Sequence, residues 1–102
     1  MAKTKVGSKN LKTTLTKTEK AQALVWQIVF AIPKDKVATY GQIATMAGLP
    51  EQSRMVGRIL SRLPKGSKIP WHRVINSQGK ISNPNPSRQQ QRLEADGITL
   101  VN

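Results

Sequence analysis

Residues 37–63, VATYGQIATMAGLPEQSRMVGRILSRL, predict two short helices joined by a sharp turn, around which the rest of the domain is expected to fold. Thr39 is expected to cap the first helix, and Gly48 to end it with the positive φ that such a turn needs. The second helix is expected from about Glu51 to Leu63. Apolar residues at helical spacing would form the buried faces: Ile43, Ala44 and Ala47, then Met55, Val56, Ile59, Leu60 and Leu63. Two short helices joined by a glycine-containing turn match a helix-turn-helix motif.

The second helix also carries a row of cations. Arg54, Arg58 and Arg62 are spaced four residues apart, so they share one helical face, and Glu51 is the only acid on this helix. The solvated face of an ordinary helix would show the same spacing. The charge of the chain favours DNA contact, because 17 Lys and Arg against five Asp and Glu give a net charge of +12 in 102 residues. Such a charge attracts a polyanion whose phosphates release counterions on binding.

Composition also excludes several classes of protein. No apolar run approaches the roughly 20 residues that cross a bilayer, and the N-terminus lacks the apolar segment of a secretory signal. We therefore expect no membrane partner, and a cytoplasmic or, in a bacterium, nucleoid-associated monomer. The sequence has no cysteine and one histidine, which excludes disulfides and thiolate chemistry and argues against a metal centre. No cofactor and no metal are expected.

The segments before the motif divide into an arm and a helix. Residues 1–17 carry five lysines and no acid, which predicts a disordered basic arm that either solubilises the chain or follows phosphates. Residues 18–102 are expected to form one domain. It would begin with a helix from Glu19 to about Ile32, capped by Thr18. Its expected apolar stripe is Leu24, Val25, Ile28, Val29 and Ile32, with Trp26 and Phe30 packing beside it.

The segments after the motif predict a hairpin and a final helix. Residues 72–75 and 80–81, separated by the turn residues 76–79, are typical of a small β-hairpin. A helix from Pro86 to about Ala95 follows; its expected cap, core anchor and end are Asn85, Leu93 and Gly97.

The hairpin begins within IPWHRVI, residues 69–75, which holds the only histidine and one of two tryptophans. His72 beside Arg73 suggests a general base, but the sequence offers no thiol, adjacent serine or paired carboxylates for it to act with. Trp71 behind a proline and next to a basic helix fits a stacking surface for an unstacked base. Packing in the core is the alternative for Trp71, and a structural hydrogen bond is the alternative for His72.

From about residue 25 to residue 101 the chain resembles the DNA-binding, active-site domain of O6-alkylguanine-DNA alkyltransferases. It is more similar to the alkyltransferase-like proteins, which carry tryptophan where the enzymes carry the nucleophilic cysteine. The resemblance rests on three ordered motifs: TYGQIA at 39–44, RMVG at 54–57 and IPWHRVI at 69–75. It implies a mainly α, winged-helix-like fold with a helix-turn-helix and a small β-hairpin.

The resemblance also implies roles for particular residues. Arg54 would enter the base stack as a finger, from a recognition helix in the minor groove, while Tyr40 would rotate the target's 3′ phosphate. Trp71 would line a lesion pocket. The other implied pocket residues are Tyr40, His72, Arg73, Ile81 and Ser82; further implied DNA contacts are Thr39, Gln42, Ser53, Arg58, Arg62, Lys65 and Lys68. His72 and Asp96 correspond to the enzymes' proton-relay partners, and Ile81, Ser82 and Asn83 to a loop over the pocket.

Two positions depart from the family pattern. Leu63 stands where the enzymes have an asparagine that supports the active-site strand. NPNP at 83–86 stands where some relatives carry an arginine that reaches the base, so a base-sensing cation would have to be Arg73 or Arg88.

The expected function is therefore recognition of damage in DNA without chemistry. The protein would flip O6-alkylguanine out of duplex DNA, bend the duplex, transfer no alkyl group, and flag the lesion for nucleotide excision repair proteins. The alternative is a helix-turn-helix transcriptional or architectural DNA-binding protein without lesion specificity.

Overall fold

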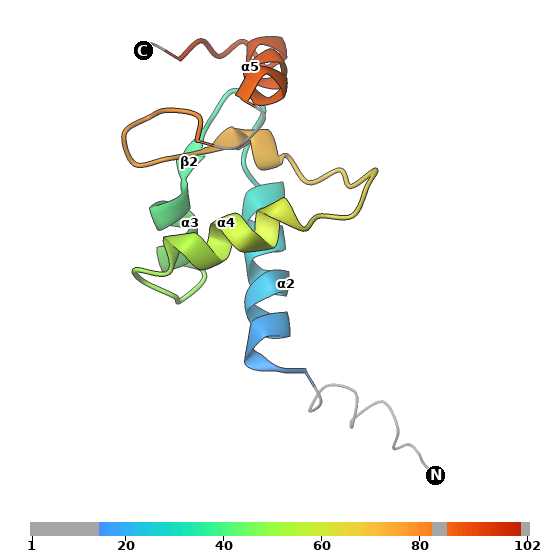
Figure 1. Ribbon diagram of the computed structural model, residues 1–102, viewed down its shortest axis with the longest axis vertical. Helices are drawn as coiled ribbons and strands as arrows, with labels where there is room; N and C mark the ends of the chain where they lie inside the picture. Colours follow the sequence, from blue (N-terminus) through green and yellow to red (C-terminus); the bar gives the residue numbers. More distant parts are fainter. Residues whose placement is uncertain (1–14, 83–85, 101–102) are drawn as a thin grey trace.

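The computed structural model describes residues 15–82 and 86–100, which form a mainly helical domain. The elements in chain order are α2 (Lys17–Phe30), β2 (Ala38–Thr39), α3 (Tyr40–Met46), α4 (Ser53–Ser61), the 3-10 turn η1 (Trp71–Arg73), β3 (Val74–Ile75) and α5 (Pro86–Ala95). Helices α3 and α4 pack on each other and on α2, while α5 packs on η1 at the end of the molecule away from the start of α2 (Figure 1). The predicted class, mainly α with a helix-turn-helix, is confirmed. Across the described residues, no helix is long and apolar enough to cross a membrane.

Helix α2 begins earlier than predicted because Thr16, not Thr18, is its cap. The Thr16 hydroxyl accepts a hydrogen bond from the Glu19 N–H at 3.0 Å, and the Glu19 carboxylate accepts one from the Thr16 N–H at 2.9 Å. This reciprocal capping box satisfies two backbone donors at once. Lys17, assigned to the basic arm, is therefore helical. Residues 1–14 of the predicted arm lie outside the described residues.

The buried face of α2 is narrower than the predicted stripe. Its buried residues are Ala21, Val25 and Val29, and Ile32 just beyond the helix is also buried. Leu24 and Phe30 are 43% and 64% exposed, so the prediction that both pack is wrong. Each stands one residue, about 100° of helical rotation, from the buried row. Trp26 is half-buried against the core, as expected.

The helix-turn-helix is confirmed, with one difference in the turn. Thr39 caps α3 through the same reciprocal box with Gln42, at 3.0 and 2.8 Å. Gly48, with φ 77°, ends the segment as predicted. Glu51 also adopts a positive φ of 66°, which is incompatible with a right-handed helix. Helix α4 therefore begins at Ser53 and not at Glu51.

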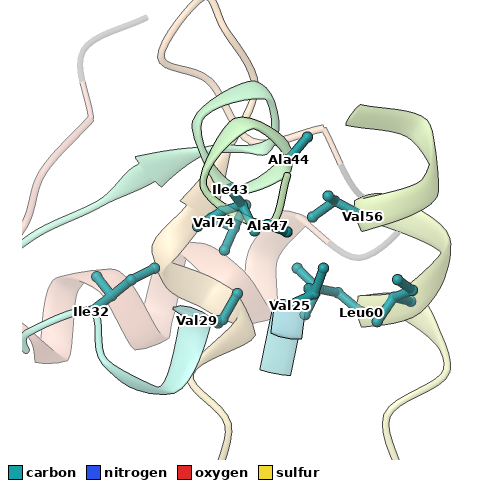
Figure 2. Close-up of a cluster of buried hydrophobic side chains, with 10 residues drawn as sticks. Val25, Val29, Ile32, Ile43, Ala44, Ala47, Val56, Leu60 and Val74 are labelled. Atoms are coloured by element: carbon teal, nitrogen blue, oxygen red, sulfur yellow. The ribbon is translucent and has the colours of Figure 1, made fainter. Parts of the chain in front are cut away.

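Figure 2 shows the core at the junction of these helices. Val25 and Val29 of α2 meet Ile43 and Ala44 of α3, and Val56 of α4 closes the cluster; all five are 0% exposed. The burial of branched side chains from three helices fixes the angle between α3 and α4, so residues on their outer faces are held in place.

The predicted hairpin is wrong, because the two strands of the described chain pair in parallel. Ala38 pairs with Val74 and Thr39 with Ile75. Residues 76–80 form a closed turn in place of a second strand. The Asn76 side-chain oxygen accepts from the N–H groups of Gln78 and Lys80 at 3.0 and 2.9 Å. Two backbone bonds, from Asn76 N–H to Lys80 C=O and from Gly79 N–H to Asn76 C=O, complete the turn. An Asx-type turn, in which a side chain bonds to nearby backbone groups, thus takes the place of a ladder of hydrogen bonds between two strands.

Helix α5 agrees with the prediction in its bounds and its anchor. It begins at Pro86, where a missing N–H costs nothing, and ends at Ala95, with Gly97 at φ 83° beyond it. Leu93 is 1% exposed. The predicted cap Asn85 lies outside the described residues.

Candidate nucleic-acid interface

A cavity of about 380 Å³ opens where α3, α4 and η1 meet. Residues of all three sequence motifs line it: Tyr40, Ser53, Arg54, Gly57, Leu60, Ser61, Trp71 and Ser82. This volume lies within the range of small-molecule pockets, and the lining combines aromatic and apolar faces with a few polar groups. Such a cavity can take an aromatic base and hold it by stacking and a few hydrogen bonds.

Tyr40 forms one wall of this cavity. It is the first residue of α3, directly after the cap Thr39, so the capping box fixes its backbone. Its ring lies 4.0 Å from the point where a Cβ would stand on Gly57 of α4, which brings the phenol against the second helix. Burial raises the pKa of Tyr40, and a hydrogen bond with the Ser82 side chain partly opposes this. The phenol is therefore neutral at physiological pH and can approach an anion without repulsion.

Arg54 stands at the mouth of the cavity. It is the second residue of α4, on the exposed side, and Arg58 and Arg62 follow at one-turn intervals, also exposed. Lys65 and Lys68 extend the positive surface beyond the helix. Within residues 15–82 and 86–100, every ion pair belongs to Asp96, so these five cations face solvent without a carboxylate partner. An uncompensated basic row suits contact with phosphates.

Trp71 is held by the backbone around it. Its N–H donates to the Ile69 carbonyl at 2.8 Å, and the Arg73 N–H donates to the Pro70 carbonyl at 3.0 Å, which closes the turn η1. The Ile69 N–H is satisfied by the Ser67 hydroxyl at 3.2 Å. Leu63 packs against the core and contributes no polar group. Local backbone bonds thus support the Trp71 segment.

Gln89 supplies the remaining support and was not singled out in the sequence. This side chain of α5 is 1% exposed, and its amide N–H groups donate to the carbonyls of His72 and Val74, both at 2.9 Å. Those carbonyls flank Arg73, so α5 clamps the backbone just after Trp71. A polar residue on the same helical face as Leu93, four positions later, was the available signal.

The next two residues after Trp71 belong to a separate polar cluster. His72 Nε2 lies 2.9 Å from Asp96 Oδ2. Arg73 reaches the same carboxylate through Nε at 2.8 Å and Nη2 at 3.3 Å, and donates through Nη1 to the Ile32 carbonyl at 2.9 Å. The Asp96 side chain is 9% exposed. This cluster ties the end of α2 to η1 and to the end of α5.

The electrostatics of the cluster keep His72 neutral. Burial lowers its pKa, while the hydrogen bond to Asp96 opposes the shift. The hydrogen bonds from Arg73 hold the pKa of Asp96 below its ordinary value, so the carboxylate is ionised. His72 Nε2 then donates to Asp96, and Nδ1 is left unprotonated, buried, and without a partner in the described part of the chain. His72 acts here as a structural hydrogen-bond donor.

The structure brings together only some of the expected site residues. Tyr40, Ser53, Arg54, Trp71 and Ser82 share the cavity, whereas His72, Arg73 and Ile81 do not line it. His72 and Arg73 line a separate depression, and Ile81 a small one beside α5. Thr39 and Gln42 form the capping box of α3, and Asn83 lies outside the described residues. Gly57, Leu60 and Ser61 line the cavity but were not predicted there.

The two candidate base-sensing cations also differ in their surroundings. Arg73 is engaged by Asp96 and the Ile32 carbonyl. Arg88 lies over the Trp71 ring, with its guanidinium carbon 5.9 Å from the ring centroid. Of the two, Arg88 is the one next to the cavity wall. The described chain contains no group of three His, Cys, Asp or Glu side chains that could hold a metal ion.

Several known proteins are similar to this chain in sequence. DNA base-flipping proteins of Vibrio parahaemolyticus and Escherichia coli are 57% and 53% identical over 78 residues, which cover 74% of this chain and 78% and 60% of those proteins. Alkyltransferase-like protein 1 of Schizosaccharomyces pombe is 44% identical over 80 residues, 74% of each chain. The chain thus spans less than two thirds of the E. coli relative.

Solved structures agree with these matches. The S. pombe alkyltransferase-like protein in complex with damaged DNA containing O6-carboxymethylguanine superposes with a TM-score of 0.78 at 39% identity, over 82% of both chains. Mycobacterium tuberculosis O6-methylguanine methyltransferase gives a TM-score of 0.67 at 32% identity, over 74% of this chain and 47% of that one. The family model of the 6-O-methylguanine DNA methyltransferase DNA-binding domain matches residues 20–98. The chain therefore belongs to the family of 6-O-methylguanine DNA methyltransferase DNA-binding domains.

Proposed function

We propose that this protein recognises O6-alkylguanine in duplex DNA by flipping the base into the cavity at Trp71, without transferring the alkyl group. The observation that carries the proposal is the joint lining of one cavity by Tyr40, Arg54 and Trp71, from three separate motifs. A base flipped out of the stack needs a group to fill the gap, a group to displace the backbone and a surface to receive the base. These three side chains supply one of each.

The duplex would be bound first through its phosphates. The exposed row on α4 would follow the minor groove, and Arg54 at its start would enter the stack as the finger. Tyr40, kept neutral by its raised pKa, would press on the 3′ phosphate and favour rotation of the nucleotide. Binding in the minor groove reads little sequence, which suits a protein that seeks damage in any context.

The absence of alkyl transfer follows from the composition. Transfer needs a strong nucleophile beside the O6 carbon, and the family enzymes use a thiolate there. The chain has no cysteine, and Trp71 presents an indole at that position. His72 donates to Asp96 and does not line the cavity, so it has no substrate atom within reach. The indole would contact the alkyl group as an apolar surface.

The relatives support binding and base flipping. The proteins of V. parahaemolyticus and E. coli bear the name of that activity, and the S. pombe protein has been solved on damaged DNA. Because a protein that binds a lesion without repairing it needs a downstream system, we extend the proposal to delivery of the lesion to nucleotide excision repair proteins.

The test uses three matched duplexes with guanine, O6-methylguanine or a bulkier O6-alkylguanine at one position. We expect tighter binding to both alkylated duplexes and, by mass spectrometry, no added methyl group on the protein and intact O6-methylguanine in the DNA. Equal affinity for the three duplexes would contradict the proposal and favour a transcriptional or architectural DNA-binding protein. Loss of the methyl group from the DNA would reveal an enzyme.

A further inference from the structure

A second cavity adjoins the first at Trp71. It measures about 730 Å³ and lies between the end of α4, the turn at residues 64–67 and α5. Leu60, Ser61 and Trp71 line both cavities. A group that extends from the first cavity past the indole would therefore enter the second, which we call the cationic groove.

The lining of the cationic groove is positively charged. Arg88 and Arg92 lie one turn apart on α5, with guanidinium carbons 5.9 and 5.7 Å from the Trp71 ring centroid, and Lys65 lies in the turn opposite. No acidic residue lines the groove. Asp96 is engaged by His72 and Arg73, and among the described residues no other carboxylate forms an ion pair.

Contact with the indole positions these two guanidinium groups. A cation over an aromatic ring is attracted by the ring quadrupole, which limits the rotamers of a long side chain. The guanidinium retains its N–H donors for in-plane hydrogen bonds, and its fork matches a carboxylate. Two such groups one turn apart, with no acid to neutralise them, form a site for an anionic oxygen pair.

We propose that the cationic groove receives the O6 substituent and that Arg88 and Arg92 select substituents ending in a carboxylate. This inference rests on the proposed function, because a base must first occupy the cavity at Trp71. The substituent on O6 would then pass the indole and place its carboxylate between the two arginines. A neutral substituent of the same size would fit the groove but would leave both cations without an anionic partner.

The experiment compares duplexes with guanine, O6-methylguanine, O6-carboxymethylguanine or its neutral amide, O6-carbamoylmethylguanine. We expect the native protein to bind the carboxymethyl duplex about tenfold more tightly than the carbamoylmethyl duplex, as for a charged hydrogen-bonded pair. In Arg88→Gln/Arg92→Gln this ratio falls to about one. In Arg88→Lys/Arg92→Lys, which keeps both charges, at least part of the ratio survives.

The matched control is Lys34→Gln/Lys36→Gln. It removes the same two charges from the exposed turn after α2, and neither lysine lines the two cavities. We expect weaker binding to all four duplexes with the carboxymethyl ratio unchanged.

Three outcomes separate the hypotheses. A ratio near one in the native protein, or one that survives Arg88→Gln/Arg92→Gln, overturns the inference. An equal loss of affinity for all four duplexes in that variant also overturns it, because the arginines would then bind a DNA phosphate. Failure of the native protein to prefer O6-methylguanine to guanine counts against the proposed function itself.

Discussion

Trp71 and His72 are consecutive residues, yet they belong to regions of opposite character. Trp71 lines an open cavity with Tyr40 and Arg54. The Arg54 guanidinium is exposed and has no carboxylate partner in the described chain. His72 and Arg73 belong to a closed cluster around Asp96, in which nearly every donor is hydrogen-bonded to an acceptor. Trp71, His72 and Arg73 all belong to the 3-10 turn η1, whose first residue lines the cavity and whose next two join the cluster.

The comparison shows how a site for recognition can be supported without being crowded. In the cavity, the Arg54 guanidinium and the rings of Tyr40 and Trp71 remain available to contact a ligand. The Asp96 side uses its polar groups to join α2, η1 and α5. We therefore expect substitutions in the first region to change binding, and those in the second to change stability.

The largest effect is expected from Asp96→Ala, which leaves Arg73 and His72 without their buried acceptor. The free energy of unfolding should fall by about 3 kcal/mol, as when one partner of a buried ion pair is removed. Denaturant unfolding at pH 7 measures it, with Asp35→Ala in an exposed turn as the control. A decrease no larger than that of the control would show that the cluster does not hold the fold together.

Arg54→Ala should weaken binding to O6-methylguanine DNA about 30-fold, as for a residue at the centre of an interface, and should leave the melting temperature almost unchanged. Tyr40→Phe should weaken it less, because the ring remains. Arg58→Ala is the control, since Arg58 shares the face but does not line the cavity. Equal decreases in affinity for Arg54→Ala and Arg58→Ala would remove the special role of the finger.

The stability of the protein is expected to depend on pH through His72. The pKa of His72 is lower in the folded state than the ordinary value of 6.5, so the unfolded chain binds more protons as pH falls below that value. The free energy of unfolding should decrease from pH 7 towards pH 5. His72→Gln should flatten this limb, because the sequence has no other histidine.

A second limb belongs to Asp96 at lower pH. Its folded pKa lies below 3.8, so its stabilising contribution is present above that value and is lost as pH falls through the folded pKa. This limb should survive His72→Gln. An unchanged slope between pH 7 and pH 5 in the variant would show that His72 is not the titrating group.

The smallest effect is expected from Lys65→Gln/Lys68→Gln, because neither lysine lines the cavity with Tyr40 and Arg54 or pairs with Asp96. Affinity should fall by a similar, modest factor for damaged and undamaged duplexes. The slope of log affinity against log salt should become shallower by about one for each DNA phosphate that the variant no longer neutralises. Titrations at several salt concentrations measure this. A selective decrease in lesion binding would instead place these lysines in recognition.

Local signals in the sequence predicted the parts of the fold that are locally determined. Thr39 three residues before Gln42 is a capping box, and Gly48 supplies the positive φ of the turn, so the helix-turn-helix was confirmed. The same logic was applied to the wrong threonine at the start of α2. Thr18 was predicted as the cap, but Thr16 stands three residues before Glu19 and forms the capping box. Tyr40, Arg54 and Trp71, one from each motif, line one cavity, and their predicted roles in DNA binding stay predictions.

The features that depend on distant contacts were not predictable in this way. Strand β3 pairs with β2 and not with residues 80–81, because the Asn76 side chain closes the turn that follows β3. The alternation of apolar and polar residues in the sequence does not reveal this competition between a turn and a hairpin. Arg73 was assigned to the pocket, but it reaches a carbonyl 41 residues away in sequence. Phe30 is a large apolar residue typical of a core, yet its side chain is 64% exposed.

The parallel pairing of Ala38 with Val74 and Thr39 with Ile75 sets the width of the cavity. Tyr40 follows one strand directly and Trp71 precedes the other by one turn, so the spacing between the two aromatic walls is fixed by the backbone ladder. The lengths of the loops around the cavity do not set this spacing. The turn at residues 76–80, none of which lines the cavity, could therefore gain or lose residues without altering the width of the cavity.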